Sequence, residues 1–267
     1  MKEDTLRKTT ASLEFYFEQL LRFVEQPKFV KDNTYPRWRF PNEGVAEAVL
    51  LKGARIISAL NALINLLRGG YVQEMGVICR TIDEFLLDIA FLLEGFPKKE
   101  LSGSQRQFLD DFYQEEFDRP ENPLESTQKR KTVSRKKMYA SIGRTMSEIV
   151  NPQHGQKIFS TIGKAFSGYV HGAYPHVMEL YGGSPPKFHL DGMLNTPRDE
   201  EAVRNSMHYF YRGIQALMFI ALAFKKPSIF DDLKKVREKF EQETGYFPID
   251  ALGKVIHLGD GTKKTKK

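Results

Sequence analysis

The chain has 267 residues, 41% of them hydrophobic and 12% aromatic, and a formal net charge of +6. This composition excludes a disordered chain, because enough apolar side chains are present to bury a core. The single cysteine, Cys79, excludes an intramolecular disulfide and favours a reducing compartment, so we expect a cytoplasmic protein. The most apolar run, 214–224, is shorter than the ~20 residues that a bilayer requires, so we expect no signal peptide and no membrane partner.

Hydrophobic residues recur with a spacing near 3.6 along most of the chain, which predicts an all-α protein without strands. A segment bounded by Pro27 and Pro41 interrupts the pattern between the first two helices. Short connections favour antiparallel neighbours, so the second and third helices should form a hairpin. The predicted helices cover 5–25, 42–68, 71–95, 104–117, 133–149, 156–171 and 199–224, and a last helix follows Ser228.

Residues with special backbone preferences mark several helix ends. The glycine pair ending at Gly70 closes the second helix. Thr196 as N-cap, Pro197 at the first helical position and Asp199 at the third predict the start of a core helix. Ser228 has the same cap spacing before the final helix.

The predicted fold class is an all-α helical bundle with four long core helices, 42–68, 71–95, 156–171 and 199–224. N-terminal and C-terminal helices and a helical insertion complete it. The expected organisation is an N-terminal helix and proline-bounded loop over 1–41, a bundle domain over 42–226 with the insertion at about 100–150, and a C-terminal helix with a basic tail over 227–267.

The segment 164–172 places polar side chains on one side of a predicted helix. If 156–171 is helical throughout, Lys164, Ser167 and His171 gather on the side opposite an apolar face. Two interpretations remain open. His171 and Lys164 form part of a site, or the segment is a helix end, with Gly172 after the last turn and His171 near the negative end of the helix dipole.

A second candidate lies in the predicted third helix, where Arg80 and Glu84 are four residues apart and share a face. This helix is apolar nearly all round, so both charges should be partly buried. The pair is either an internal ion pair that orients the helices, or an arginine held ready for an anionic ligand.

Three basic features favour an anionic partner. Six cations within 129–137, and a lysine-rich tail, are typical of contact with a phosphate backbone, although solvated loops carry such runs too. Residues 35–41 interleave aromatic and basic side chains, so Trp38 is either a base-stacking residue or an anchor onto the bundle. In the predicted helix 199–224, Arg204, His208 and Arg212 are spaced by four residues and form either an anion-binding groove or a solvated face. The predicted nucleic-acid-binding residues are Lys129, Arg130, Lys131, Arg135, Lys136, Lys137, Arg204, His208 and Arg212.

The sequence lacks the motifs of several common classes of enzyme and metal site. Neither a Walker-type nor a Rossmann glycine loop is present, and no zinc-binding pattern accompanies the pair His171 and His176. Cys79 lies in an apolar run, which disfavours a nucleophilic role. We therefore expect no cofactor and no metal.

The arrangement of Arg80-x-x-x-Glu84 in a helix pair, followed by Ser-x-Tyr-Val-His-Gly over 167–172, resembles uncharacterised bacterial members of the HEPN (higher eukaryotes and prokaryotes nucleotide-binding) superfamily. The resemblance covers about 42–95 and 156–224. It implies a metal-independent endoribonuclease, often dimeric, in a toxin or phage-defence system. Catalytic members carry arginine, four to six residues, then histidine. Here Lys164 replaces that arginine before His171, and Arg204 precedes His208 by only four positions.

The resemblance assigns roles that are chemically coherent for RNA, which carries its own nucleophile. His171 would act as acid or base, Lys164 and Arg80 would bind the scissile phosphate, and Glu84 would orient one of them. The alternative is a non-catalytic helical interaction or scaffold module, in which the same polar residues fix the bundle.

Overall fold

The computed structural model describes residues 2–31, 36–94, 96, 100–119, 121–145, 157, 160, 161, 164 and 166–247. Over these residues the protein is an all-α helical bundle, which confirms the predicted fold class. Two very short antiparallel hairpins, which the sequence did not predict, are the strands in this part of the chain.

The bundle is built from long helices, with shorter elements around it. The long helices are α1 (Lys2–Leu21), α2 (Val45–Gly69), α3 (Val72–Leu92), α9 (Pro197–Ala223) and α10 (Pro227–Thr244). The shorter elements are β1 (Lys28–Val30), β2 (Arg37–Arg39), α4 (Gly103–Tyr113), a 3-10 turn (Pro123–Glu125), α5 (Arg135–Thr145), α7 (Ser167–Val170), α8 (Tyr174–Met178), β3 (Tyr181–Gly182) and β4 (Lys187–Phe188).

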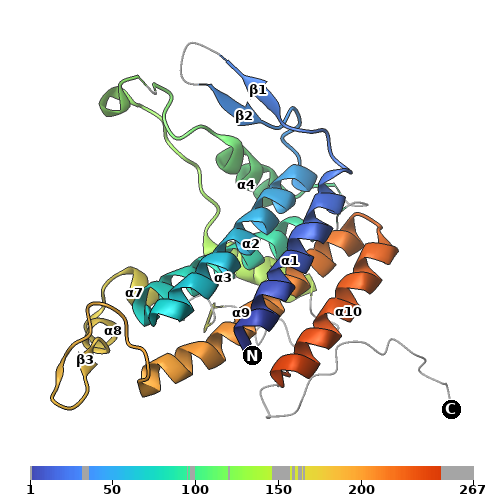
Figure 1. The fold of residues 1–267 in the computed structure, drawn as a ribbon. Helices are drawn as coiled ribbons and strands as arrows, with labels where there is room; N and C mark the ends of the chain where they lie inside the picture. The colour runs from blue at the N-terminus through green and yellow to red at the C-terminus, as the bar shows by residue number, and fades with distance from the viewer. Residues whose placement is uncertain are drawn as a thin grey trace.

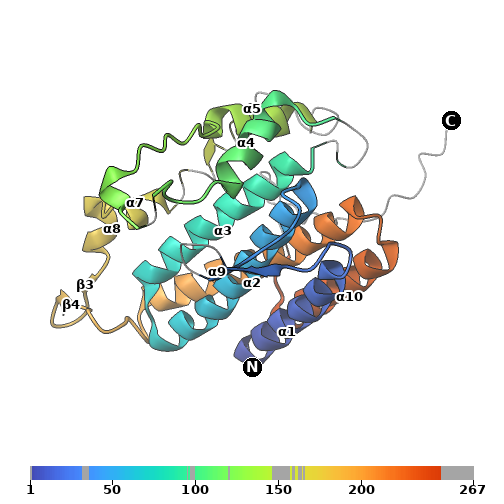
Figure 2. The same cartoon turned by 90° about the horizontal axis from the view of Figure 1, so that it is seen from above.

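Helices α2 and α9 lie at the centre of the bundle. The terminal helices α1 and α10 pack side by side along them, and α3 covers α2 and α9 from the other side (Figures 1 and 2). Both terminal helices therefore contribute to the same core as the middle of the chain. Figure 2 shows α4 and α5 along the outer side of α3, and α7, α8 and the β3–β4 hairpin at one end of the bundle.

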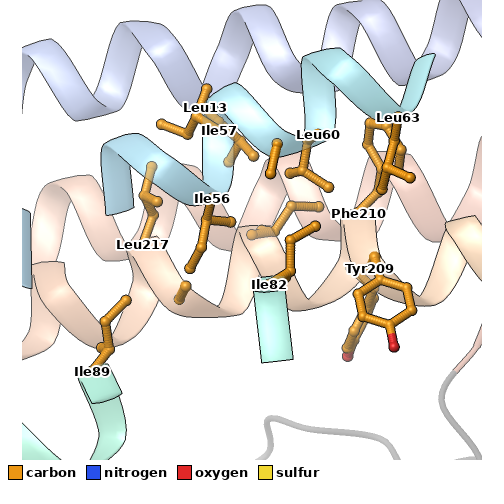
Figure 3. Close-up of a cluster of buried hydrophobic side chains, with 14 of the residues drawn as sticks. Leu13, Ile56, Ile57, Leu60, Leu63, Ile82, Ile89, Tyr209, Phe210 and Leu217 are labelled. Carbon is orange, nitrogen blue, oxygen red and sulfur yellow. The ribbon is translucent and has the colours of Figure 1, made fainter. Parts of the chain in front are cut away.

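The core is a continuous cluster of aliphatic and aromatic side chains from all the long helices. Figure 3 shows the part of it that α1, α2, α3 and α9 form. Leu60 of α2, Ile82 of α3 and Phe210 of α9 have no solvent exposure. Burying one such side chain contributes about 1.5–3 kcal/mol, so this cluster is the main source of stability. A smaller cluster, formed by Leu87 and Phe91 with Met138 and Ile142, docks α5 onto α3.

The turn between α2 and α3 is sealed by a distant segment. Gly70 adopts the left-handed conformation at φ 68°, as predicted for a helix-closing glycine. Its carbonyl accepts a hydrogen bond from the Met193 amide at 2.8 Å, and the Tyr71 hydroxyl donates to Asp191 at 2.8 Å. A Cβ on Gly192 would lie 1.9 Å from the Gly69 carbonyl oxygen, so only glycine permits this approach.

The expected long helix over 156–171 is interrupted. Phe166 has φ 58°, in the left-handed region, and α7 begins only after it. A bulky residue in that conformation cannot continue a right-handed helix, so the described helical positions before it, among them Lys164, do not share one helix face with His171. The remainder of the predicted helix lies outside the described residues.

The predicted caps are confirmed at one helix and wrong at another. The Thr196 hydroxyl accepts a hydrogen bond from the Asp199 amide at 3.3 Å, as the N-cap of α9. Helix α10 begins at Pro227, so Ser228 lies inside its first turn and caps nothing. Proline at the first helical position already has the required φ and lacks the amide that a cap would satisfy.

In the described part of the chain, α2 alone is long and apolar enough, by composition, to cross a membrane. Half of its most apolar window is buried inside the bundle, however, as expected for a core helix.

Candidate nucleic-acid interface

Arg80 and Glu84 form an ion pair on the side of α3 that faces α5. The guanidinium lies 2.6 Å from the carboxylate, and the two side chains are 16% and 38% exposed. The spacing of four residues brings them together on one helix face, as predicted from the sequence. Arg80 is therefore held by a carboxylate and little exposed to solvent.

The same face of α3 binds cations from two other helices. Arg135 of α5 contacts Asp88 at 2.5 Å and Glu84 at 3.8 Å, and Lys52 of α2 contacts Asp88 at 2.8 Å. Arg135, predicted to bind nucleic acid, thus ties α5 to α3. Lys52 and Asp88 were not predicted as members of this cluster, although Asp88 follows Arg80 and Glu84 at the same interval of four residues.

His171 and Lys164 are both exposed. His171 ends the short helix α7, and Gly172 follows at φ 60°, which is the helix-end geometry that the sequence allowed. Helix α7 packs on α3. None of the described pockets is lined by Arg80, Glu84, Lys164 or His171.

The three residues of α9 that were predicted to bind nucleic acid have different surroundings. Arg204 is exposed, whereas Arg212 forms an ion pair with the buried Asp83 of α3, which also accepts a hydrogen bond from the Tyr209 hydroxyl at 3.0 Å. Burial raises the pKa of Asp83, and the nearby Arg212 opposes that shift. His208 is hydrogen-bonded to the Tyr246 hydroxyl. Arg212 and His208, two of the three residues of the predicted anion groove, are therefore engaged in contacts within the protein.

Strands β1 and β2, within the predicted loop between Pro27 and Pro41, form an exposed aromatic pair of strands. Strands β1 and β2 place Phe29 opposite Trp38, with ring centroids 5.3 Å apart in an edge-to-face arrangement. The side chains are 55% and 64% exposed. Trp38 is therefore not the predicted anchor onto the bundle, because its ring packs on its own hairpin and remains open to solvent.

Glu115, which follows α4, joins this hairpin to the basic segment, residues 129–137. Its carboxylate contacts Arg39 at 2.7 Å and Arg37 at 3.2 Å. Arg39 holds the pKa of Glu115 below its usual value, against the effect of burial. The Glu115 carbonyl accepts hydrogen bonds from Gln128 at 2.5 Å and from Arg130 at 3.3 Å. Two regions about 90 residues apart in sequence therefore meet at one residue.

The basic segment then follows α4 toward α5. Gln107 of α4 donates to the Lys131 carbonyl at 2.8 Å, which fixes the backbone of the segment. All four of its lysines are exposed and have no carboxylate partner among the described residues: Lys129, Lys131, Lys136 and Lys137. Arg130 and Arg135 bind internal groups instead.

The described residues contain no group of three or more histidine, cysteine or carboxylate side chains placed to hold a metal ion. Comparison of the chain with protein-family models, curated proteins and solved structures gives no match.

Proposed function

We propose that this protein is an RNA-binding helical bundle that holds a single-stranded segment on its basic-aromatic surface, defined by Phe29, Trp38 and the four exposed lysines of the basic segment. The observation that carries the proposal is the bridge at Glu115, which places an exposed aromatic pair beside a row of exposed cations. We place the protein in the reducing cytoplasm, where the buried Cys79 remains a thiol.

The chemistry of this surface matches the two components of single-strand recognition. Exposed aromatic rings stack on unpaired bases, and each base contributes roughly 1–3 kcal/mol. Exposed lysines bind phosphates without reading sequence, and release counterions as they do so. A duplex hides its base faces, so Phe29 and Trp38 favour a single strand over a double helix.

The test uses Trp38, the only tryptophan in the chain, as its own reporter. A single-stranded uridine-rich RNA should quench Trp38 fluorescence, and Trp38→Ala should weaken binding roughly tenfold when a labelled RNA is followed by anisotropy. Tyr174→Ala, which removes an exposed aromatic ring at the other end of the bundle, is the matched control and should leave affinity unchanged.

Replacing the four exposed lysines of the basic segment with glutamine should reduce the salt slope by ~0.7 units for each phosphate of a single strand that the variant no longer binds. The control makes the same change of charge elsewhere, at Arg22, Lys187, Lys235 and Lys239, and should keep the slope. Equal affinities and slopes for the parent and both variants would leave the scaffold module as the better assignment.

RNA cleavage is a narrower proposal, favoured by the exposure of His171 on a helix that packs on α3, the helix of Arg80. A histidine with access to solvent can transfer the proton of a ribose hydroxyl without a metal. The RNA recovered from the binding assay, sized on a gel in the presence of a chelator, should be cut by the parent protein and intact after His171→Ala. Identical products from both proteins would exclude His171 as the acid or base.

A further inference from the structure

A pocket of about 240 Å³ lies between α3 and the N-terminal half of α9, and neither Arg80 nor Glu84 lines it. Its apolar walls include Met75 and Cys79 of α3 and the rings of Phe166 and Tyr169. These two rings stack with centroids 5.7 Å apart. The pocket is smaller than the roughly 300–1,000 Å³ of sites for drug-sized ligands, so it fits a compact molecule.

The rim of the pocket carries more negative than positive charge. Arg198 of α9 contacts Glu201 at 3.0 Å and Glu179 at 3.4 Å, so one guanidinium faces two carboxylates. Glu179 is further fixed by the Tyr169 hydroxyl, which donates to it at 2.6 Å. An excess of negative charge at this rim, in a chain of net charge +6, favours a cationic ligand.

Arg198 is partly exposed where it contacts the two carboxylates of this rim. Its side chain is 44% exposed and that of Glu201 is 49% exposed, and an ion pair between two such exposed side chains contributes little to stability. The same three residues, Glu179, Arg198 and Glu201, also line a wider neighbouring hollow of about 670 Å³. The guanidinium therefore has open space to enter when another cation takes its place between the carboxylates.

We propose that this pocket binds a small primary arylalkylamine, independently of the RNA-binding surface. The aromatic ring of the ligand lies against Phe166 and Met75, and its ammonium group donates hydrogen bonds to Glu179 and Glu201 in place of Arg198. Charge-assisted hydrogen bonds to two carboxylates, beside an apolar wall, select an amine over a neutral molecule of the same shape.

The experiment measures binding of phenethylamine and of its neutral analogue, phenethyl alcohol, to the full chain by calorimetry. The amine should bind and the alcohol should bind at least tenfold more weakly, since the alcohol offers no charged donor. Glu201→Gln should weaken amine binding about tenfold. Glu200→Gln, one position away and outside the lining of the pocket, is the matched control and should bind like the parent.

Arg198→Ala separates this proposal from an anion site. It should tighten amine binding severalfold, because the competing cation is gone and both carboxylates remain. Each variant is accepted only if its melting temperature is close to that of the parent, and exposed rim residues allow this. Absence of amine binding, equal binding of amine and alcohol, or weaker amine binding by Arg198→Ala would each overturn the assignment.

Discussion

Asp83 and Glu84 are adjacent in α3, yet they lie in opposite environments. Asp83 points toward α9 and is 2% exposed, where it pairs with Arg212 and Tyr209. Glu84 points toward α5 and is 38% exposed, where Arg80 and Arg135 meet it beside solvent. One step of about 100° around a helix separates a structural charge from an accessible one. Burial therefore determines which charged residues of this bundle stabilise it.

The largest expected change in the free energy of unfolding is on the buried side of α3, which faces α9. Arg212→Met should lower the free energy of unfolding by about 3–5 kcal/mol, because it leaves the Asp83 carboxylate buried without its ion-pair partner. Urea denaturation at neutral pH measures this loss. Asp83→Asn combined with Arg212→Met should recover much of it, since no buried charge then remains. Arg198→Met, at an exposed ion pair, is the control and should cost no more than about 1 kcal/mol. Similar losses in the free energy of unfolding for Arg212→Met and Arg198→Met would contradict the conclusion that burial determines which ion pairs stabilise the bundle.

A smaller expected effect is the pH dependence of stability that the partly buried His208 produces. Burial, assisted by the nearby Arg212, lowers the pKa of His208 to about 4. In the unfolded chain a histidine titrates near 6.5, so between about pH 6.5 and 4 the unfolded state binds a proton that the folded state does not. Stability should therefore fall as the pH drops through this window, by at most about 3 kcal/mol.

Urea denaturation across that pH window measures the loss in the parent protein. His208→Gln removes the titrating group and should flatten the pH dependence over the same range, while the other histidines stay in place. A slope that His208→Gln leaves unchanged would mean that His208 does not carry it.

The smallest expected change in the free energy of unfolding is on the solvent-accessible side of α3, which faces α5. Arg135→Ala should cost about 1 kcal/mol, because Arg135 is partly exposed and Asp88 keeps its contact with Lys52 at 2.8 Å. Hydrogen exchange should increase in α5, which loses a tether to α3. Lys136→Ala, a neighbour whose side chain is exposed, should change neither quantity. If Arg135→Ala lowered the free energy of unfolding as much as Arg212→Met does, the ion pairs between α3 and α5 would behave as buried ones, which contradicts the prediction.

Helical periodicity was enough to predict the bundle, because burial on one side of each helix imposes the spacing of its apolar residues. Glycine and proline signals located the α2–α3 turn and the start of α9. The interruption at Phe166 was not predictable, since Phe166 continues the apolar pattern. In the structure its ring packs on Tyr169 and Tyr209. The β1–β2 hairpin was missed for a related reason, because three-residue strands give almost no alternation.

The sequence identified candidate charges but not their partners. Spacing of four residues predicted the Arg80–Glu84 contact, which is local. The contacts of Arg135 with Asp88, of Arg212 with Asp83, and of Glu115 with two arginines each join distant segments, and a single sequence contains no signal for such pairs. The basic segment was recognised by its charge, whereas only the structure distinguishes its exposed lysines from the arginines that bind internally.

The seal on the α2–α3 turn has a consequence for the synthesis of the chain. Tyr71 and Asp191 are 120 residues apart, so the two-helix unit leaves the ribosome well before the segment that closes it. At about 5–20 residues per second, that interval lasts roughly 6–24 s. During this time the apolar sides of α2 and α3 that α9 later covers have no partner from the second half of the chain. Chaperones that bind nascent apolar helices have their longest opportunity at this stage.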